Sequence, residues 1–181
     1  DKLCVETWVE SAMRFFTSRN FAFTSPEGKI YGYGRSVWAM IDTLTRQPAD
    51  IFAIHDGIIN NYIEKDYPCP IVAPSRVKMG SGALLVNELK TQYSDVDING
   101  HINSVKYIEH TLDLFPIEWH KSHFLKRFEM AYVAEAHGGD VLMFYKEQTG
   151  DMEFCIRIMK RDTSDTGTVE VARGKAVFIK K

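Results

Sequence analysis

A short stretch at residues 95–103 concentrates side chains that could do chemistry. It contains Asp95, Asp97, Asn99, His101 and Asn103, alternating with mostly apolar residues. A histidine can transfer protons near neutral pH, and a nearby amide or carboxylate can orient it or hold a water molecule. Because polar and apolar residues alternate, we expect the polar side chains to project together while the apolar ones pack inward.

Two other interpretations of this stretch compete with a catalytic one. It matches the opening of a calcium-binding EF-hand loop, D-x-D-x-N-G, but the twelfth position of that loop should be a bidentate glutamate and here is Lys106. The residues before it also alternate like a strand, which disfavours calcium. A polar turn in which Asn103 caps a following helix fits the pattern as well as a functional site does.

The elements that must position this stretch are mainly strands. Period-two alternation, typical of half-buried strands, covers residues 3–10, 13–24, 29–43, 86–93, 125–136, 141–148, 152–160 and 169–179. Turn-forming residues separate them at 26–28, 137–140, 149–151 and 162–167. One long helix is expected after residue 103, with an apolar stripe at Val105, Ile108, Leu112 and Phe115, closed by Pro116.

A proline-rich connector, with a short helix expected over residues 51–63, indicates two units, 1–74 and 75–181. Residues 5–8 precede a break much as residues 133–135 precede Gly138 and Gly139. We therefore expect a weak internal repeat whose first copy lacks a leading strand and helix, and an N-terminus that is truncated. Two unrelated antiparallel sheets are the alternative.

Composition and charge narrow the class of protein. A net charge of -2 gives no reason to expect nucleic acid or an anionic membrane as a partner. No apolar run is long enough to span a membrane. The three widely spaced cysteines favour a reducing cytoplasmic setting over a disulfide framework or a zinc motif, and Cys155 is expected in the core.

Two motifs resemble one known family. Residues 96–108, V-D-I-N-G-H-I-N-S-V-K-Y-I, resemble the L-D-x-N-x-H-x-N-N-x-K-Y signature of acyl-ACP thioesterases. Residues 132–140 are similar to the family's Y-x-x-E-C-G-x-D segment, and residues 5–8 and 38–46 resemble its N-terminal half. The resemblance implies an α+β tandem (double) hotdog, in which antiparallel sheets wrap around a long helix, and hydrolysis of fatty acyl-ACP without cofactor or metal.

The resemblance also implies catalytic roles for Asp97, Asn99, His101 and Glu135. Glu135 would act as general base or nucleophile, and His101 would shuttle the proton or polarise water. Asn99 or backbone N–H groups would hold water or the oxyanion, and Asp97 would orient Asn99 or His101. Ala136 stands where an older proposal for the family placed a nucleophilic cysteine, which excludes that mechanism here.

Spacing alone says less about the second motif. Without the resemblance, Glu135 is most simply a solvent-facing strand residue and His137 a turn residue.

The implied partner is acyl carrier protein, which is acidic, so a locally basic docking surface is expected. The candidates are Lys121, Lys126, Arg127, Lys160, Arg161, Arg173 and Lys175. Scattered solubilising charge explains these residues at least as well. Hotdog sheets often pair, so the sequence leaves open whether two copies form a homodimer. Alternative functions are hydrolysis of acyl-CoA or another thioester, and a non-catalytic acyl-binding module.

Overall fold

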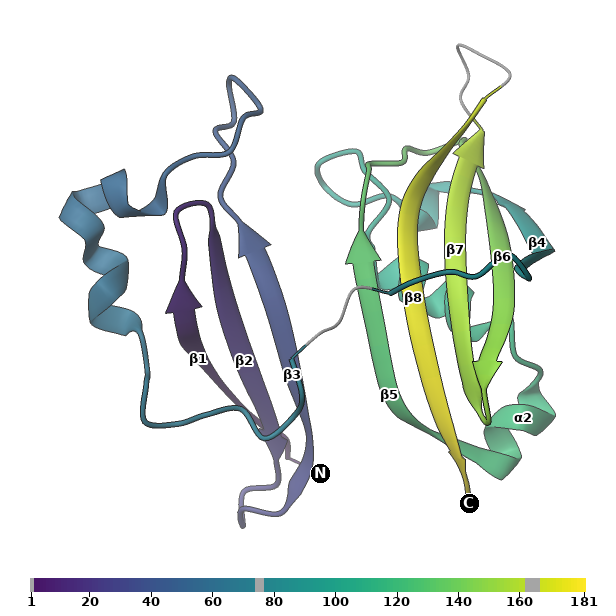
Figure 1. Cartoon of the computed structure of the whole chain (residues 1–181), viewed down its shortest axis with the longest axis horizontal. Coiled ribbons are helices and arrows are strands. Elements are labelled where there is room, and N and C mark those ends of the chain that lie inside the picture. Colours follow the sequence, from purple (N-terminus) through teal and green to yellow (C-terminus); the bar gives the residue numbers. More distant parts are fainter. Residues whose placement is uncertain (1, 74–76, 162–166) are drawn as a thin grey trace. The chain divides into compact units, whose positions relative to one another are not determined.

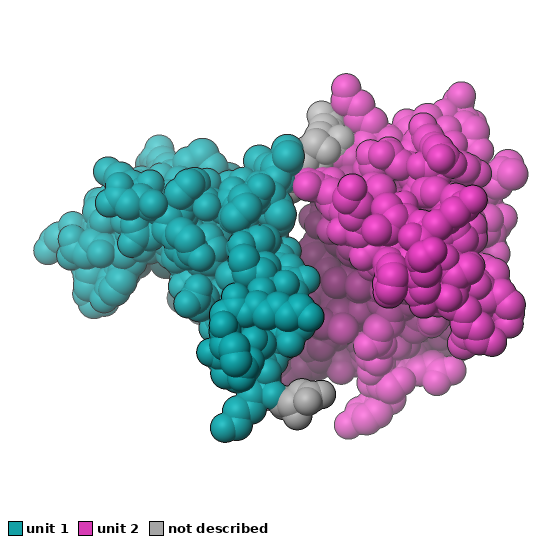
Figure 2. Space-filling model, turned by 90° about the horizontal axis from the view of Figure 1, so that it is seen from below, with its two compact units in different colours: residues 1–74 teal, residues 75–181 magenta. Residues whose placement is uncertain are grey.

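Two antiparallel sheets, one in each of two units, provide most of the regular secondary structure of the chain. The computed structural model describes residues 2–73, 77–161 and 167–181 (Figure 1). The units comprise residues 1–74 and 75–181, and Figure 2 colours them separately. In the described ranges no helix is both long and apolar enough to cross a membrane.

The sheet of unit 1 is a three-stranded meander. Its strands are β1 (Cys4–Ala12), β2 (Phe16–Thr24) and β3 (Ile30–Ala39), paired in that order. The alternation predicted all three. However, β3 stops at Ala39 rather than near residue 43, because the Asp42 carboxylate accepts hydrogen bonds from the amides of Leu44 and Thr45 at 3.0 and 2.7 Å and closes a turn.

The helix expected over residues 51–63 is present in distorted form. Element η1 (Ile51–Tyr62) is a 3-10 helix, broken by positive φ angles at His55, Asp56 and Gly57. It follows the edge of the sheet beside β1, where Val9 and Ile63 form a parallel bridge (Figure 1).

Unit 2 is built on a five-stranded antiparallel sheet. The strands are β4 (Leu84–Lys90), β5 (His123–Tyr132), β6 (Val141–Gly150), β7 (Glu153–Arg161) and β8 (Thr168–Lys180), in the order β4-β6-β7-β8-β5. All five were predicted to within a few residues, except that β5 ends four residues early. The turn expected at 162–167 lies, apart from Gly167, outside the described residues.

The prediction of one long helix closed by Pro116 is wrong. Helix α1 (Ser104–Leu112) ends with Asp113 as its C-cap, and a second helix, α2 (Ile117–Ser122), follows. Pro116 begins α2 rather than ending α1. Its ring fixes φ, here -65°, and it has no N–H to leave unpaired at the start of a helix.

The helical segment lies against one face of the five-stranded sheet (Figure 1). Its aromatic side chains join the hydrophobic core there. Tyr107 and Phe115 join a core that includes Phe144, Ile156 and Phe178, all 5% exposed or less. The buried face of α1 is Tyr107 and Thr111, whereas Val105 of the predicted stripe is 51% exposed. Cys155 is buried in β7, as expected.

Strand pairing changes how the two units correspond. The predicted internal repeat made β1 the counterpart of the strand expected over residues 125–136, which is β5. In the structure β1 pairs with the next strand along the chain, β2, whereas β5 pairs with β8. The meander β1-β2-β3 has the same topology as β6-β7-β8. The predicted alignment of residues 5–8 with residues 133–135 therefore does not match the strand topology.

Candidate active site

Two loops of unit 2 are held together by main-chain hydrogen bonds. The amide of Ile102 donates to the carbonyl of Ala136 at 2.8 Å, and His101 pairs with His137 in an isolated antiparallel bridge. This pairing brings the stretch before α1 against the segment after β5. Residues more than thirty positions apart in the sequence thus become neighbours.

Asp97 shapes the first loop through the backbone. Its Oδ1 accepts hydrogen bonds from the amides of Asn99 at 2.8 Å and His101 at 3.2 Å. The amide of Asp97 in turn donates to the carbonyl of His101 at 2.8 Å, and Gly100, with φ of 81°, makes the tight turn between them. Asp97 therefore orients the main chain that carries His101.

His101 and Glu135 face each other across the two loops. The distance from His101 Nε2 to Glu135 Oε2 is 3.4 Å, with side-chain exposures of 30% and 50%. Glu135 lies beyond the end of β5 at Tyr132, so the expectation of a strand reaching residue 136 is wrong. Direct proton transfer needs a heavy-atom distance of about 2.6 to 3.2 Å, so the two side chains have to close by only a few tenths of an ångström.

Asn99 and Ile98 lie on the exposed tip of the first loop. The hydrogen bond of Asn99 to Asp97 is made by its backbone, and its side chain is exposed. Ile98 is fully exposed, contrary to the expectation that it packs inward. It occupies a turn closed by a hydrogen bond from the Gly100 amide to the Asp97 carbonyl at 3.0 Å, which points its side chain outward.

His137 joins this site, although the sequence suggested only a turn residue. Its ring meets that of His101 edge to face, with centroids 5.2 Å apart. Nitrogen or carboxylate oxygen atoms of His101, Glu135 and His137 lie within 4.8 Å of one another. The available signal was its position two residues after Glu135, because alternate residues of an extended segment point to the same side.

A buried threonine supports the turn that carries His137. Thr91, 4% exposed, has a hydroxyl that donates to the His137 carbonyl at 2.9 Å and accepts from the Gly139 amide at 2.8 Å. Asp140 Oδ2 accepts from the His137 amide at 3.0 Å and lies 3.4 Å from Lys160 Nζ. The turn is thus fixed to the end of β4 and to β7.

The start of α1 is capped as predicted, and its surroundings exclude the EF-hand interpretation. Asn103 Oδ1 accepts from the Val105 amide at 2.9 Å. Asp95 is 5% exposed, and its Oδ1 lies 3.0 Å from His110 Nε2, so this carboxylate is already engaged. Lys106 takes the place of the final calcium ligand and lies 2.7 Å from Glu109, a hydrogen bond that raises the pKa of the lysine.

Tyr107 packs beneath this capped helix start. It is 3% exposed, and burial raises its pKa from 10.0 to about 12. Its ring meets Tyr132 edge to face, and the Tyr132 hydroxyl donates to the Ser104 carbonyl at 2.9 Å. Two aromatic rings therefore tie the first turn of α1 to the end of β5.

The basic residues considered for docking are mostly paired with nearby acids. Six of the seven form ion pairs: Lys121 with Glu118, Arg127 with Glu129, Lys160 with Asp140, Arg161 with Glu88, Arg173 with Glu170 and Lys175 with Glu153. Local compensation of charge favours the interpretation as solubilising surface residues over a basic docking face.

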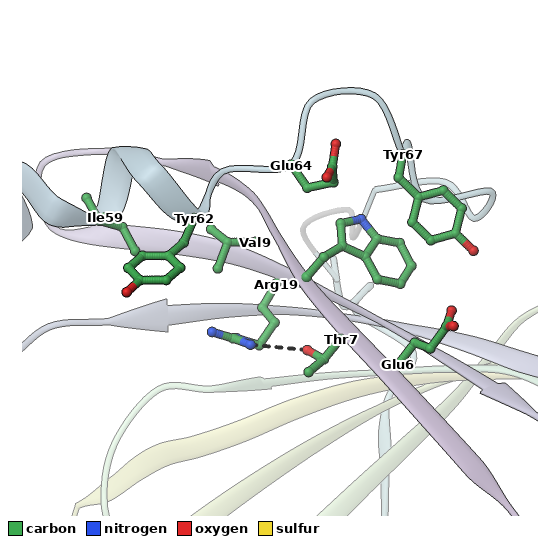
Figure 3. A pocket seen from close by; sticks show the side chains of 9 residues that line it. Glu6, Thr7, Val9, Arg19, Ile59, Tyr62, Glu64 and Tyr67 are labelled. Atoms are coloured by element: carbon green, nitrogen blue, oxygen red, sulfur yellow. Dashed lines mark hydrogen bonds between the residues drawn. The ribbon is translucent and has the colours of Figure 1, made fainter.

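Unit 1 has a separate hollow that contains none of the predicted site residues. It measures about 740 Å³ and lies between β1, β2 and residues 59–67 (Figure 3). Arg19 Nη1 donates to Thr7 Oγ1 at 3.2 Å on its floor, and Trp8 stacks on Tyr67 with centroids 4.5 Å apart. Its mixed aromatic and charged lining does not contain a histidine or a nucleophilic cysteine.

Comparison with known proteins identifies the family. Residues 81–178 match the model of the acyl-ACP thioesterase C-terminal domain, and residues 1–62 match that of the N-terminal domain. An acyl-ACP thioesterase from Bacteroides thetaiotaomicron is 48% identical, with a TM-score of 0.86 over 98% of this chain and 68% of that one. The chain belongs to the acyl-ACP thioesterase family, which confirms the resemblance seen in the sequence.

Plant relatives agree with this assignment over shorter spans. A chloroplastic palmitoyl-acyl carrier protein thioesterase from Gossypium hirsutum is 28% identical over 148 residues, which are 78% of this chain and 35% of that protein. The chain spans between 35% and 47% of the length of the curated relatives it matches.

The solved structures also define the fold. The 12:0-ACP thioesterase from Umbellularia californica, 21% identical, has a TM-score of 0.78 over 99% of this chain and 68% of that one. Together with the Bacteroides structure it shows a hotdog-type thioesterase fold, mostly antiparallel sheet with few helices.

Proposed function

We propose that this chain hydrolyses the thioester of a fatty acyl group carried on acyl carrier protein, releasing the free fatty acid. The observation that carries the proposal is the 3.4 Å approach of His101 Nε2 to Glu135 Oε2, on loops that the backbone holds together. Membership of the acyl-ACP thioesterase family supports the substrate class.

The residues suit the demands of thioester hydrolysis. A thiolate is a good leaving group, so the protein must chiefly deliver a nucleophile and stabilise the oxyanion. In one route Glu135 accepts a proton from the attacking water, and His101 passes that proton to the leaving sulfur. In the other route Glu135 attacks the carbonyl while a protonated His101 gives its proton to the leaving sulfur. Water then opens the acyl anhydride, which restores the Glu135 carboxylate, and the proton that the water loses returns to His101. Asp97 keeps His101 in position by holding the loop backbone, and the Asn99 side chain, or an amide at the start of α1 other than those that Asn103 already caps, holds the oxyanion.

The two routes for Glu135 differ in where oxygen from water ends up. Turnover in ¹⁸O-labelled water followed by mass spectrometry of the protein distinguishes them. Label in the Glu135 carboxylate establishes an acyl anhydride on that residue. Label confined to the fatty acid fits direct attack by water and also an anhydride opened at its fatty acyl carbon, and capture of the acyl group on Glu135 by hydroxylamine then identifies the anhydride.

We also propose that the two units are halves of a tandem hotdog, with the catalytic residues in the second, residues 75–181. The matches of residues 1–62 and 81–178 to separate domain models support this division. Within the described part of unit 1, the helical element is η1, so the first half as described has no long central helix.

Paired carboxamide variants test the site directly. Glu135→Gln and His101→Gln should each lower kcat on a long-chain acyl-ACP by about 10²- to 10⁴-fold, because each removes a proton-transfer group. Glu109→Gln is the matched control, since Glu109 on α1 is 51% exposed against 50% for Glu135. Circular dichroism checks that every variant is folded. Full activity in Glu135→Gln or His101→Gln would refute the assignment.

The substrate class needs its own comparison. The same acyl group is presented on acyl carrier protein and on coenzyme A, and kcat/KM is measured for both. A preference for the carrier protein supports the proposal, and a preference for coenzyme A contradicts it. If the wild-type chain binds a fluorescent fatty acid but releases no product from either thioester, it is a non-catalytic acyl-binding module.

A further inference from the structure

His137 gives the site a chemical property that hydrolysis does not use. Two imidazoles and one carboxylate converge in the same small volume, with their nitrogen or oxygen atoms within 4.8 Å of one another. His101 and His137 lie opposite each other in a backbone bridge, so their relative position is fixed by the main chain. Glu135 reaches into the same volume from two residues before His137.

The distances match those that a small metal ion requires. Two ligand atoms bound tetrahedrally to Zn²⁺ lie about 3.3 Å apart, as follows from metal–ligand distances of about 2.0 to 2.1 Å. His101 Nε2 and Glu135 Oε2 are already 3.4 Å apart. The ligand atom of His137 lies within 4.8 Å of the other two, and because His137 is exposed its ring can turn inward by the roughly 1.5 Å or less that coordination needs.

The types of ligand select the class of metal. Imidazole nitrogen binds Zn²⁺ and neighbouring transition metals, whereas Mg²⁺ and Ca²⁺ prefer oxygen ligands in larger number. Two histidines and one glutamate also leave a fourth position open on Zn²⁺. Hydrogen bonds to Asp97 and Asp140 hold the backbone amides of the two histidines, so the main chain that carries both ligands is fixed.

We propose that His101, Glu135 and His137 form a Zn²⁺-binding site, and that the metal inhibits the hydrolase reversibly. Bound Zn²⁺ takes up the Nε2 lone pair of His101 and a carboxylate oxygen of Glu135. The His101 nitrogen can then no longer accept a proton from water, and the charge of the metal lowers the basicity of the second carboxylate oxygen of Glu135. The inhibition rests on the proposed thioesterase function, whereas the binding of the metal does not.

Calorimetry on the 181-residue chain tests the binding without any reference to activity. Titration with Zn²⁺ should show one ion bound per site, and titration with Mg²⁺ should show no binding. His137→Gln should weaken Zn²⁺ binding by at least about tenfold, since loss of even an outer-shell partner costs about 10- to 100-fold. His55→Gln, which removes an exposed histidine of unit 1, should bind Zn²⁺ like the wild type.

The rate of acyl-ACP hydrolysis, measured with and without Zn²⁺, tests the inhibition. Each variant is compared with its own metal-free rate, so a change in basal activity does not affect the result. Zn²⁺ should inhibit the wild type and His55→Gln, and His137→Gln should need at least about ten times more metal for the same inhibition.

Three outcomes would overturn the proposal. They are the absence of Zn²⁺ binding, equal affinity in the wild type and His137→Gln, and Zn²⁺ binding that leaves the rate unchanged or increases it. A chain that binds Zn²⁺ through His137 but hydrolyses no thioester would refute the proposed function and the inhibition, while the metal site would stand.

Discussion

Replacing Thr91 and Thr111 by valine, one at a time, compares two buried threonines. The hydroxyl of one is hydrogen-bonded, and the hydroxyl of the other is not. Thr91 is 4% exposed, and its hydroxyl bonds to the His137 carbonyl and the Gly139 amide. Thr111 is fully buried on α1, and its hydroxyl has no hydrogen-bond partner among the described residues. Valine has nearly the same shape as threonine, so each variant changes chiefly the hydroxyl.

The expected changes in the free energy of unfolding have opposite signs. Thr91→Val leaves a carbonyl and an amide without their partner, which costs about 1 to 3 kcal/mol for each fully buried group. His137 and Gly139 are exposed, so water partly replaces the hydroxyl and we expect a total loss of about 1 to 2 kcal/mol. Thr111→Val removes an unpaired buried hydroxyl and should be neutral or stabilising by up to about 1 kcal/mol.

Urea unfolding followed by circular dichroism measures both changes. With a slope of about 2 kcal/mol per molar urea, Thr91→Val should lower the midpoint by about 0.5 to 1 M, while Thr111→Val leaves it unchanged or raises it. Hydrogen exchange of the Gly139 amide is the local measurement, and its protection should fall in Thr91→Val alone. Equal midpoints for the two variants, or unchanged protection of Gly139, would refute this reasoning.

Two further predictions concern the start of α1. Asn103→Ala should destabilise the chain by about 1 kcal/mol in urea unfolding, because the Val105 amide loses its cap, and Asn103→Asp, which retains the cap, should not. The second concerns Tyr107, whose pKa is about 12 in the native state and 10.0 ordinarily, so the native state holds this proton more tightly than the unfolded state does. The stability that results is complete below pH 10 and is lost as the pH rises toward 12. The urea midpoint of the wild type should therefore fall between a pH of about 9 and about 11 more steeply than that of Tyr107→Phe, and parallel curves would contradict this.

The strands were predictable because alternation is a local property. A strand with one buried face must alternate, and every strand described here was expected, although β3 and β5 end about four residues earlier than predicted. Their pairing depends on segments far apart in the sequence, and the alternation of β5 does not show that it pairs with β8 rather than β6. The helix was misjudged for a similar reason, because burial of Thr111 and exposure of Val105 depend on the sheet beneath α1.

The candidate site likewise has features that follow from the local sequence and features that depend on tertiary structure. Asn103 was predicted to cap the helix because the capped amide belongs to a residue two positions away. The approach of His101 to Glu135 was indicated by the resemblance to a family, not by spacing, since it depends on the pairing of two loops. His137 was missed because a histidine beside two glycines is also an ordinary turn residue, and only the tertiary structure brings its ring next to His101 and Glu135.

The pairing of the two loops has a consequence for how this site can change. The main chain at residues 101 and 137 is held by backbone hydrogen bonds and by Asp97, Thr91 and Asp140, none of which depends on the side chains at 101, 135 and 137. Substitutions at those three positions therefore alter the reactive groups while the loops keep their shape. Evolution or directed selection can therefore exchange the ionisable side chains at these positions by single codon changes, without first having to rebuild the fold.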